Sequence, residues 1–499
     1  MTLRRMRVIL NSLMAIGVSI LTGCGGSGGQ NAASSYTVGG TINGLGGATG
    51  LVLANGTDTF NVPSNTTNFT IPTMVTNGQS YDLTVKVHPT AMQCSVSSGA
   101  GTIAGENVTN ISVSCGIGTE SLVHSFVGGT TDGSDPLGVI QAMDGSLNGV
   151  TNGGGGVNGR GVLFNISPDG ATETVLYAFP TPDGVPNGNI IQATDGNFYG
   201  VGFDNGTAAH VGTVYRINPA GTSEATLYSF AGGTLDGAYP QGNLVESSDG
   251  NLFGHTAQGG RSNDGVIFEI TPSGSETVLY SFAGGPTDGA YPESLIQGSD
   301  GNLYGLTTYS GVVSTQCGAD TLSTSIGNGV LFKITPSGAE TVLHFFTGGT
   351  MDGCEPSVLI QASDGNFYGV TYGGGASNDG VIFKMTPSGT ETVLYSFSGG
   401  TMDGENPDSL MQASDGNLYG TTYIGGISSN TCGGPKGDGV LFKLTMSGVE
   451  SILHFFSGGT TDGCQPSGLI QAENGNLYGI TSFGGTGGLA NDGTIWEFN

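Results

Sequence analysis

The chain has 499 residues, and its 94 glycines far exceed the typical share of about 7 %. Only 10 % of the residues are charged while 8 % are aromatic, and no Gly-X-Y or heptad period runs through the text, which excludes charge-rich disorder, collagen and coiled coil. The formal net charge of −28 excludes nucleic-acid binding, since phosphates need a basic face. A turn-rich all-β protein remains.

The first 23 residues are typical of a secretory signal peptide. Three arginines, at positions 4, 5 and 7, precede an apolar stretch over residues 8–21 that is too short for a stable membrane span. The stretch ends in Leu21-Thr22-Gly23-Cys24, which resembles the lipobox of bacterial lipoproteins. The resemblance implies a lipid anchor on Cys24 and, with Gly25 next, an outer-membrane or cell-surface location. The alternative is an ordinary signal peptide with a chance cysteine.

Residues 24–35 are rich in Gly and Ser and predict a flexible tether. Residues 36–115 then show short alternating runs, such as Tyr81, Leu83, Val85 and Val87, separated by Asn-Gly and Gly-Gly turns. This pattern predicts a small β-sandwich, interpreted as a stalk. It resembles the Ig-like modules of bacterial lipoproteins, although it lacks the Cys…Trp…Cys spacing of immunoglobulin domains.

From residue 119 to residue 499 the chain repeats with a period of about 50 residues. Each copy carries Gly-Gly-Thr-x-Asp-Gly, then Leu-Ile-Gln-Ala-Ser-Asp-Gly-Asn-Leu-Tyr-Gly, then Gly-Val-Ile-Phe-Lys-Ile, then Glu-Thr-Val-Leu-Tyr-Ser-Phe. One copy places its four strand-sized runs at residues 359–362, 366–371, 380–385 and 391–397. Four short strands per period indicate a propeller blade, and seven copies predict a seven-bladed β-propeller. The fourth-type run at 121–126 opens the region, so we expect it to complete the last blade and close the ring.

The repeats resemble the GloVer-type tandem repeat of bacterial choice-of-anchor proteins, with residues 300–305 (Asp-Gly-Asn-Leu-Tyr-Gly) and 349–353 (Gly-Thr-Met-Asp-Gly) as typical matches. That family is defined by its repeat, so the resemblance implies a scaffold and no particular activity. The Asp-Gly-Asn-Leu segments with their aromatic residue are also similar to those of streptogramin-lyase propellers, but no position matches a lyase's catalytic residues.

Six cysteines besides Cys24 predict disulfides in an exported chain. Four of them lie in connections expected on one face of the propeller, two within each of two repeats. The predicted pairs are Cys317–Cys354, Cys432–Cys464 and, inside the stalk, Cys94–Cys115.

Seven aspartates recur once per repeat before Gly, where turn chemistry explains them and calcium binding through carboxylates is the alternative. They are Asp132, Asp183, Asp236, Asp288, Asp352, Asp403 and Asp462. A recurring glutamine is expected to form hydrogen bonds between blades, at Gln141, Gln192, Gln297, Gln361, Gln412 and Gln471, with Glu246 in the third copy. His124, His344 and His454 take the tyrosine place of the fourth run, where packing is favoured over metal binding.

Five aromatic residues follow the second run at or near its end: Phe203, Tyr309, Tyr372, Tyr423 and Phe483. Aromatic faces beside Asp and Asn hold sugars in many proteins, so these residues are the predicted ligand-binding set, with Tyr239 and Tyr291 extending the rim. Packing between blades is the alternative for each of them.

The sequence therefore predicts a monomeric surface lipoprotein whose propeller binds a glycan or a surface protein without catalysis and without an obligatory cofactor. One alternative is a secreted glycoside hydrolase or polysaccharide lyase, which needs carboxylates converging about 5 to 10 Å apart at the central channel. The other is a purely structural cell-surface protein.

Overall fold

We describe the chain from a computed structural model covering residues 34–155, 159–167, 172–180, 184–203, 211–311, 317, 327–428, 432, 436–486 and 492–499. The predicted signal peptide, Cys24 and most of the predicted tether lie outside these residues. The fold is all-β, and its described residues contain one short 3-10 turn, η1 (Gly285–Thr287). Among the same residues, no helix is both long and apolar enough to cross a membrane.

The N-terminal part, from Ser35 to Ile117, is built of two four-stranded sheets, β5-β2-β10-β8 and β4-β3-β7-β9, and the short pair β1-β6. The alternation expected around Tyr81 and Leu83 is present in β7, where both side chains are buried. Cys94 and Cys115 are opposite one another on β8 and β10 and form a disulfide. The strands are β1 Ser35–Tyr36, β2 Val38–Asn43, β3 Val52–Asn55, β4 Asp58–Asn61, β5 Asn68–Thr70, β6 Val75–Thr76, β7 Ser80–Val87, β8 Met92–Ser97, β9 Ala100–Thr102 and β10 Val108–Ile117.

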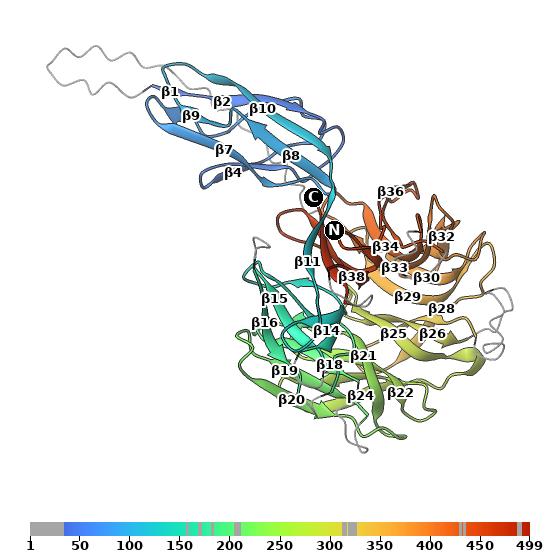
Figure 1. The fold of residues 1–499 in the computed structure, drawn as a ribbon. Helices are drawn as coiled ribbons and strands as arrows, with labels where there is room; N and C mark the ends of the chain where they lie inside the picture. The colour runs from blue at the N-terminus through green and yellow to red at the C-terminus, as the bar shows by residue number, and fades with distance from the viewer. Residues whose placement is uncertain are drawn as a thin grey trace, which may run out of the picture.

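The rest of the described chain forms seven antiparallel sheets, which we number I to VII in chain order (Figure 1). Sheet I contains β12 Gly133–Pro136, β13 Ile140–Gln141, β14 Leu147–Gly154, β15 Val162–Ile166 and β16 Glu173–Ala178. Sheet II contains β17 Ile191–Gln192, β18 Phe198–Gly202, β19 Thr213–Ile217 and β20 Glu224–Ser229. Sheet III contains β21 Gly237–Glu246, β22 Leu252–Gly259, β23 Val266–Ile270 and β24 Glu276–Ser281.

Sheet IV contains β25 Gly289–Gln297, β26 Leu303–Ser310, β27 Val330–Ile334 and β28 Glu340–Phe345. Sheet V contains β29 Gly353–Gln361, β30 Phe367–Gly374, β31 Val381–Met385 and β32 Glu391–Ser396. Sheet VI contains β33 Gly404–Gln412, β34 Leu418–Gly425, β35 Val440–Leu444 and β36 Glu450–Phe455. Sheet VII contains β37 Gly463–Gln471, β38 Leu477–Gly484 and β39 Thr494–Phe498, and its fourth strand is β11 Glu120–Ser125 from the start of the region.

Apolar side chains from consecutive sheets pack into buried clusters, so the sheets stack face to face. Sheet V packs on sheet IV through Phe367 and Tyr304, and sheet VI packs on sheet V through Leu418 and Tyr368. Sheet I packs on sheet VII, with Val162 and Ile480 in one cluster. The stack therefore closes into a propeller-like ring, with β11 paired to β39 as expected from the sequence.

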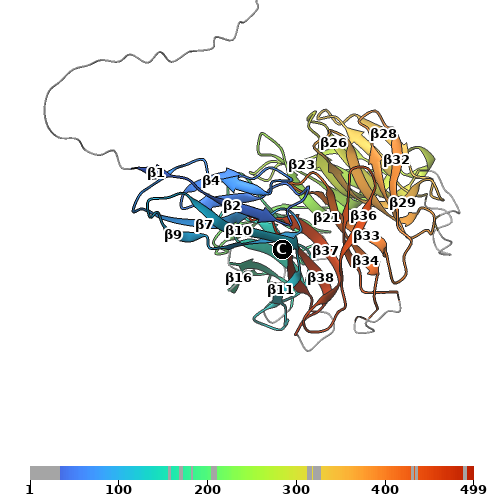
Figure 2. The ribbon, with the colours of Figure 1, turned by 90° about the horizontal axis from the view of Figure 1, so that it is seen from above.

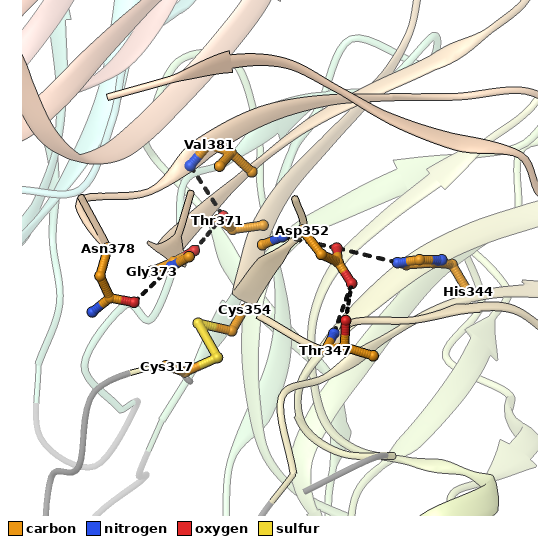
Figure 3. Close-up of a disulfide and its surroundings, with 11 residues drawn as sticks. Cys317, His344, Thr347, Asp352, Cys354, Thr371, Gly373, Asn378 and Val381 are labelled. Carbon is orange, nitrogen blue, oxygen red and sulfur yellow. Dashed lines mark hydrogen bonds and ion pairs between the residues drawn. A yellow bond between two sulfur atoms is a disulfide. The ribbon is translucent and has the colours of Figure 1, made fainter. Parts of the chain in front are cut away.

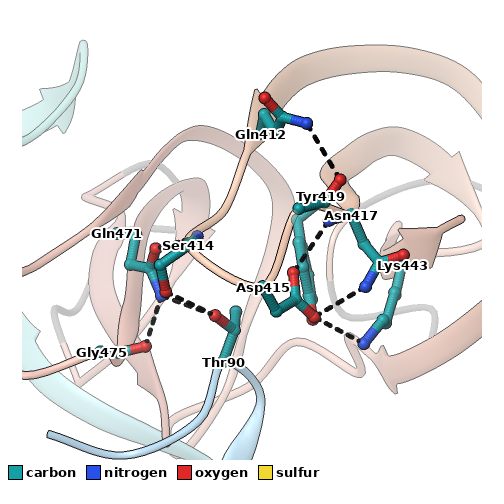
Figure 4. A network of polar contacts seen from close by, with 10 residues as sticks. Thr90, Gln412, Ser414, Asp415, Asn417, Tyr419, Lys443, Gln471 and Gly475 are labelled. Carbon is teal, nitrogen blue, oxygen red and sulfur yellow. Dashed lines mark hydrogen bonds and ion pairs between the residues drawn. The ribbon is translucent and has the colours of Figure 1, made fainter. Parts of the chain in front are cut away.

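The hairpin between the first two strands is formed by an Asp-Gly-Asn segment in sheets II to VI, by residues 144–146 (Asp-Gly-Ser) in sheet I and by residues 474–476 (Asn-Gly-Asn) in sheet VII. In sheet VI, Asp415 accepts hydrogen bonds from the Asn417 amide, the Tyr419 hydroxyl and the Lys443 ammonium group at 2.8 to 2.9 Å (Figure 4). The ammonium group also lies 5.3 Å from the ring centroid of Tyr419. Sheets IV and V repeat this arrangement around Asp300 and Asp364. The same side-chain lock of Asp, Asn, Tyr and Lys therefore holds this hairpin in sheets IV, V and VI.

The recurring glutamine connects adjacent hairpins. Gln471 donates to its own hairpin at Gly475 O and accepts from the backbone N–H of Ser414 in sheet VI. Gln361 and Gln412 accept in the same way from the preceding sheet, and Gln141 accepts from sheet VII. The hydrogen bonds between repeats that the sequence predicts are confirmed.

The ring has two different faces. The hairpin face carries the tight turns after the first strand of each sheet and, in sheets II to VI, after the third strand, and the loop face carries the longer connections. On the hairpin face, the Gln471 amide donates to Thr90 Oγ1 of the N-terminal sandwich at 2.8 Å, and His88 N–H donates to Asn474 O. Figures 1 and 2 both show the sandwich beside the ring. The loop face is therefore turned away from the sandwich.

The remaining disulfides lie on the loop face and join Cys317 to Cys354 (Figure 3) and Cys432 to Cys464. The pairing agrees with the prediction, but the expectation of bonds within one blade is wrong. Cys354 is the second residue of β29 and Cys464 the second of β37, so each disulfide joins a connection of one sheet to the first strand of the next. The three disulfides indicate an exported protein.

Candidate functional site

The innermost strands of the ring begin on the loop face with an irregular segment. A proline recurs near the start of the first strand in every repeat. The residue before it has a φ of 56 to 58° in six sheets, namely at Asp135, Tyr239, Tyr291, Glu355, Asn406 and Gln465. The pairing register shifts directly after that proline in sheets IV to VI, and one residue later, after Gln241, in sheet III. Left-handed backbone combined with a bulge turns the residue after the proline away from the regular ladder. This residue is Glu293, Ser357 and Asp408 in sheets IV to VI, whereas its equivalent in sheet III, Gln241, still pairs with His255.

Glu293 and Asp408 are the carboxylates of this inner group. The Gln241 amide donates to Glu293 Oε2 at 3.0 Å and to Pro292 O at 3.0 Å, which links sheet III to sheet IV. The Tyr372 hydroxyl of sheet V donates to Asp408 Oδ1 of sheet VI at 2.9 Å. Glu293 interacts electrostatically with both Asp408 and Tyr372, so we group the three side chains, from sheets IV, V and VI, as the inner acidic cluster: Glu293, Tyr372 and Asp408.

The pKa values of the cluster members depend on burial and on one another's charges and hydrogen bonds. Burial raises the pKa of the Asp408 carboxyl, and the Tyr372 hydrogen bond offsets part of the increase. Burial, followed by the negative charge of Asp408, raises the pKa of Glu293, while bonds from Thr308 and Gln241 oppose this. Glu293 keeps contact with solvent although protein surrounds it on most sides. A water-accessible carboxyl with a raised pKa is a group that can hold or release a proton.

The five predicted aromatic residues fall into two positions. Tyr372, Tyr423 and Phe203 occupy equivalent positions, each directly after the residue that pairs with the recurring proline. The Tyr372 side chain is directed toward the first strand of the next sheet, as its bond to Asp408 shows. Tyr309 and Phe483 come one residue later and lie opposite Ala290 and Cys464. The structure therefore brings Tyr372 into the inner acidic cluster, and the charges of Asp408 and Asp135 raise the pKa of Tyr423 after burial does.

Two further aromatic contacts extend this rim. Phe203, 47 % exposed, stacks on Tyr239 of the next sheet with a centroid distance of 4.9 Å. Tyr309 meets Tyr291 edge to face at 5.6 Å. Burial and then the charges of Glu355 and Glu293 raise the pKa of Tyr309, which places it near the acidic cluster. Aromatic faces beside carboxylates can bind polyhydroxylated rings by stacking and hydrogen bonding.

The recurring aspartates act as turn caps in the six repeats where they are described, Asp183 lying outside these residues. Asp352 accepts hydrogen bonds from Thr347 N–H and from Gly353 N–H at 2.8 Å each (Figure 3), and the other five repeat the arrangement. These six aspartates are distributed around the ring, one at each described junction between neighbouring sheets. They therefore do not come together in a single site. His124, His344 and His454 each lie beside one of them.

Sequence reasoning did not single out Glu293 and Asp408. Their position holds Leu137, Asn187, Gln241, Glu293, Ser357, Asp408 and Ser467 along the chain. The signal that could have found them is a position directly after a recurring proline that stays mostly polar while its residue type changes from each repeat to the next. Variation at a fixed place of a regular scaffold is typical of binding surfaces.

The comparison with known protein families shows to which family this chain belongs. The model of the Gloeobacter/Verrucomicrobia repeat matches residues 91–319 and 312–499. The chain belongs to the Gloeobacter/Verrucomicrobia repeat family. The match starts inside the N-terminal sandwich and extends over all seven sheets of the ring. No protein with a curated description matches the chain significantly.

Solved structures similar to this member of the Gloeobacter/Verrucomicrobia repeat family share few identical residues with it. Virginiamycin B lyase from Staphylococcus aureus is 19 % identical, with a TM-score of 0.45 over 77 % of this chain and 98 % of that chain. Oligogalacturonate lyase from Vibrio parahaemolyticus is 13 % identical, with a TM-score of 0.49 over 85 % and 98 %. The extracellular domain of a putative hybrid two-component system from B. thetaiotaomicron is 13 % identical, with a TM-score of 0.46; the match covers 74 % of this chain and 40 % of that one.

Proposed function

We propose that this chain is a surface-anchored lipoprotein that binds a glycan on the loop face of a seven-bladed β-propeller. The seven stacked sheets are the blades, and the two-sheet N-terminal part is an Ig-like stalk over residues 36–115. The lipid on Cys24 and the tether over residues 24–35 join the stalk to the membrane. The stalk contacts the hairpin face, so the loop face is the one available to a ligand.

The observation that carries the glycan proposal is the hydrogen bond from Tyr372 to Asp408 beside Glu293. The site around this bond combines an aromatic ring, two carboxylates and the Gln241 amide at the inner end of the loop face. Carboxylates and amides accept and donate to sugar hydroxyls, and Tyr423, Tyr309, Phe203 and Phe483 supply ring faces around them. The strong negative charge of the chain favours a neutral or cationic glycan over an acidic one.

A glycan array probed with the chain from Ser34 onward tests the binding. We expect Tyr372→Ala to weaken binding of the best glycan at least tenfold, because it removes both the ring and the partner of Asp408. Sheet III has Ala257 at the corresponding place, so the scaffold accepts alanine there. Lys86→Ala, in the stalk, is the control and should bind like wild type. Unchanged binding by the Tyr372 variant contradicts the proposal.

The anchor has its own test. Metabolic labelling with a palmitate analogue should label the full chain in a Gram-negative host, and Cys24→Ser should abolish the label and release the protein from the membrane fraction. A Cys24→Ser chain that stays in the membrane fraction contradicts lipid anchoring. The glycan result does not depend on this outcome, because the binding assay omits residues 1–33.

One observation favours a second function, cleavage of the bound glycan. Glu293 and Asp408 both have raised pKa values, and each is a carboxyl that can serve as a general acid or base. Product analysis of each glycan that binds separates the two functions. Intact glycan establishes binding alone, whereas shortened products that disappear with Glu293→Gln and with Asp408→Asn establish catalysis.

A further inference from the structure

The junctions between consecutive blades contain a second set of ionisable groups, far from the inner strands. Each junction joins an outer-strand side chain, the recurring aspartate and the glutamate that begins the next outer strand. Three junctions carry histidine in the outer strand: His124 with Asp132 and Glu173, His344 with Asp352 and Glu391, and His454 with Asp462 and Glu120. We call these the histidine junctions.

The three histidine junctions share one geometry. His344 Nε2 lies 3.3 Å from Asp352 Oδ1, and His454 Nε2 lies 3.2 Å from Asp462 Oδ2. In each junction the three donor atoms, one from His, one from Asp and one from Glu, lie within 4.8 Å of one another. Donor atoms around a tetrahedral ion with bonds of 2.0 to 2.1 Å are about 3.3 Å apart. The side chains are thus already near the spacing that a bound ion requires.

Unused donor atoms occur in the same junctions. Oε1 of Glu120, Glu173 and Glu391 is buried without a hydrogen-bond partner, as is Oε1 of the equivalent Glu276, Glu340 and Glu450 in the junctions without histidine. Nε2 of His124 is a further buried atom without a partner. His124 Nε2 lies 3.8 Å from Asp132 Oδ1, too far for a hydrogen bond. A buried oxygen or nitrogen without a partner costs free energy that a ligand can recover.

Other junctions of the same ring lack the histidine and provide an internal comparison. Tyr228, Tyr280 and Tyr395 take its place and donate their hydroxyl groups to Asp236, Asp288 and Asp403 at 3.0 to 3.1 Å. A neutral phenol keeps its proton and holds the aspartate through a hydrogen bond. Imidazole instead offers a lone pair that transition metals prefer.

We propose that each histidine junction binds one divalent transition-metal ion, with Zn²⁺ the best fit, through His Nε2, one Asp oxygen and one Glu oxygen. One nitrogen and two carboxylates suit Zn²⁺, whereas Ca²⁺ takes six to eight oxygen ligands. Each ion bridges the outer strands of two neighbouring blades, because the His and the Glu come from different sheets. The three ions fasten sheet VII to I, IV to V, and VI to VII.

Metal analysis of the full, untagged, disulfide-bonded protein tests this proposal. After removal of metal with EDTA and dialysis against about 10 µM free Zn²⁺ at pH 7.5, we expect three bound ions per chain, one for each histidine junction. His344→Tyr should bind two ions, and the variant with all three histidines changed to tyrosine should bind none. The tyrosine variants copy the chain's own Tyr junctions and should fold. Circular dichroism and the melting temperature confirm folding before metal is counted.

The reverse substitution gives an independent readout. Tyr395→His should create a fourth site with Asp403 and Glu450, and Co²⁺ in place of Zn²⁺ should show one additional increment of visible d–d absorption. Absence of bound Zn²⁺ in wild type, or an unchanged zinc content in the folded triple variant, would overturn the proposal. Zinc should raise the melting temperature of wild type and leave that of the triple variant unchanged.

Discussion

At the scale of single residues, the hairpin lock of Asp, Asn, Tyr and Lys shows how burial determines what the Asp–Lys ion pair contributes to the stability of the fold. Three sheets carry the same ion pair, but the aspartate side chain is 45 % exposed in Asp300, 36 % in Asp364 and 5 % in Asp415. Exposed ion pairs contribute between about 0 and 1 kcal/mol, whereas breaking a buried pair costs about 3 kcal/mol or more. We therefore expect these three Asp–Lys pairs, although chemically identical, to contribute unequally to the free energy of unfolding.

We predict that Asp415→Ala lowers the free energy of unfolding by about 3 kcal/mol, and Asp300→Ala by less than about 1 kcal/mol. Asp415→Ala leaves the hydroxyl of the buried Tyr419 without its acceptor, and it removes the ion-pair partner of Lys443, whose side chain is 30 % exposed. Urea unfolding followed by circular dichroism measures both variants. Equal losses in the two variants contradict this account.

The roles of residues that recur in every repeat could be predicted from the sequence. The groups formed by residues from different repeats could not. Gln471 and its equivalents recur at a fixed place, so their bridging role could be inferred from the repeat alone. Glu391 also recurs, but its closeness to His344 and Asp352 depends on how the outer strands of two sheets lie against each other. Glu293 and Asp408 do not recur as a type, and only the geometry of three sheets brings them to Tyr372.

At the scale of strands, the first strand begins, in six of the seven sheets, with a backbone conformation that ordinary side chains rarely adopt. Asn406 has a φ of 57° directly before Pro407, and the pairing with β34 shifts after that proline. Asn and Gly tolerate this region, while a β-branched side chain clashes with its own backbone. The four-strand blade was predictable from hydrophobic runs and turns, but this bulge was not, because five other residue types occupy the same place.

We predict that Asn406→Gly changes the free energy of unfolding by less than about 0.5 kcal/mol, and that Asn406→Val lowers it by about 1 to 2 kcal/mol. Thermal unfolding of the two variants side by side measures the difference. A Val variant as stable as the Gly variant would show that β33 can begin without the left-handed residue.

At the scale of the whole molecule, the glutamates that begin the outer strands make stability depend on pH. Burial, followed by the charge of a neighbouring aspartate, raises the pKa of Glu120, Glu276, Glu340, Glu391 and Glu450 to about 7. A raised carboxyl pKa means that the folded protein binds protons which the unfolded chain has released between about pH 4.5 and 7. Stability is therefore highest on the acidic side and decreases as pH rises toward 7.

We predict that metal-free protein is more stable at pH 5 than at pH 8 by at least about 2 kcal/mol. Glu340→Gln, which faces Asp288 and Tyr280, should be more stable than wild type at pH 8 and equal to it at pH 5, because the amide never ionises. Denaturant unfolding at both pH values measures this. A Glu340→Gln variant with the pH dependence of wild type contradicts the assignment.

The pairing of β11 with β39 has a consequence for biogenesis. β11 is the first strand of the ring to be synthesised and β39 is the last, so β11 has no partner in the ring until residue 498 has been made. Until then the growing chain exposes two unpaired sheet edges, which are templates for aggregation and targets of proteases. The ring in this way distinguishes a finished chain from a truncated one, since only the former can close.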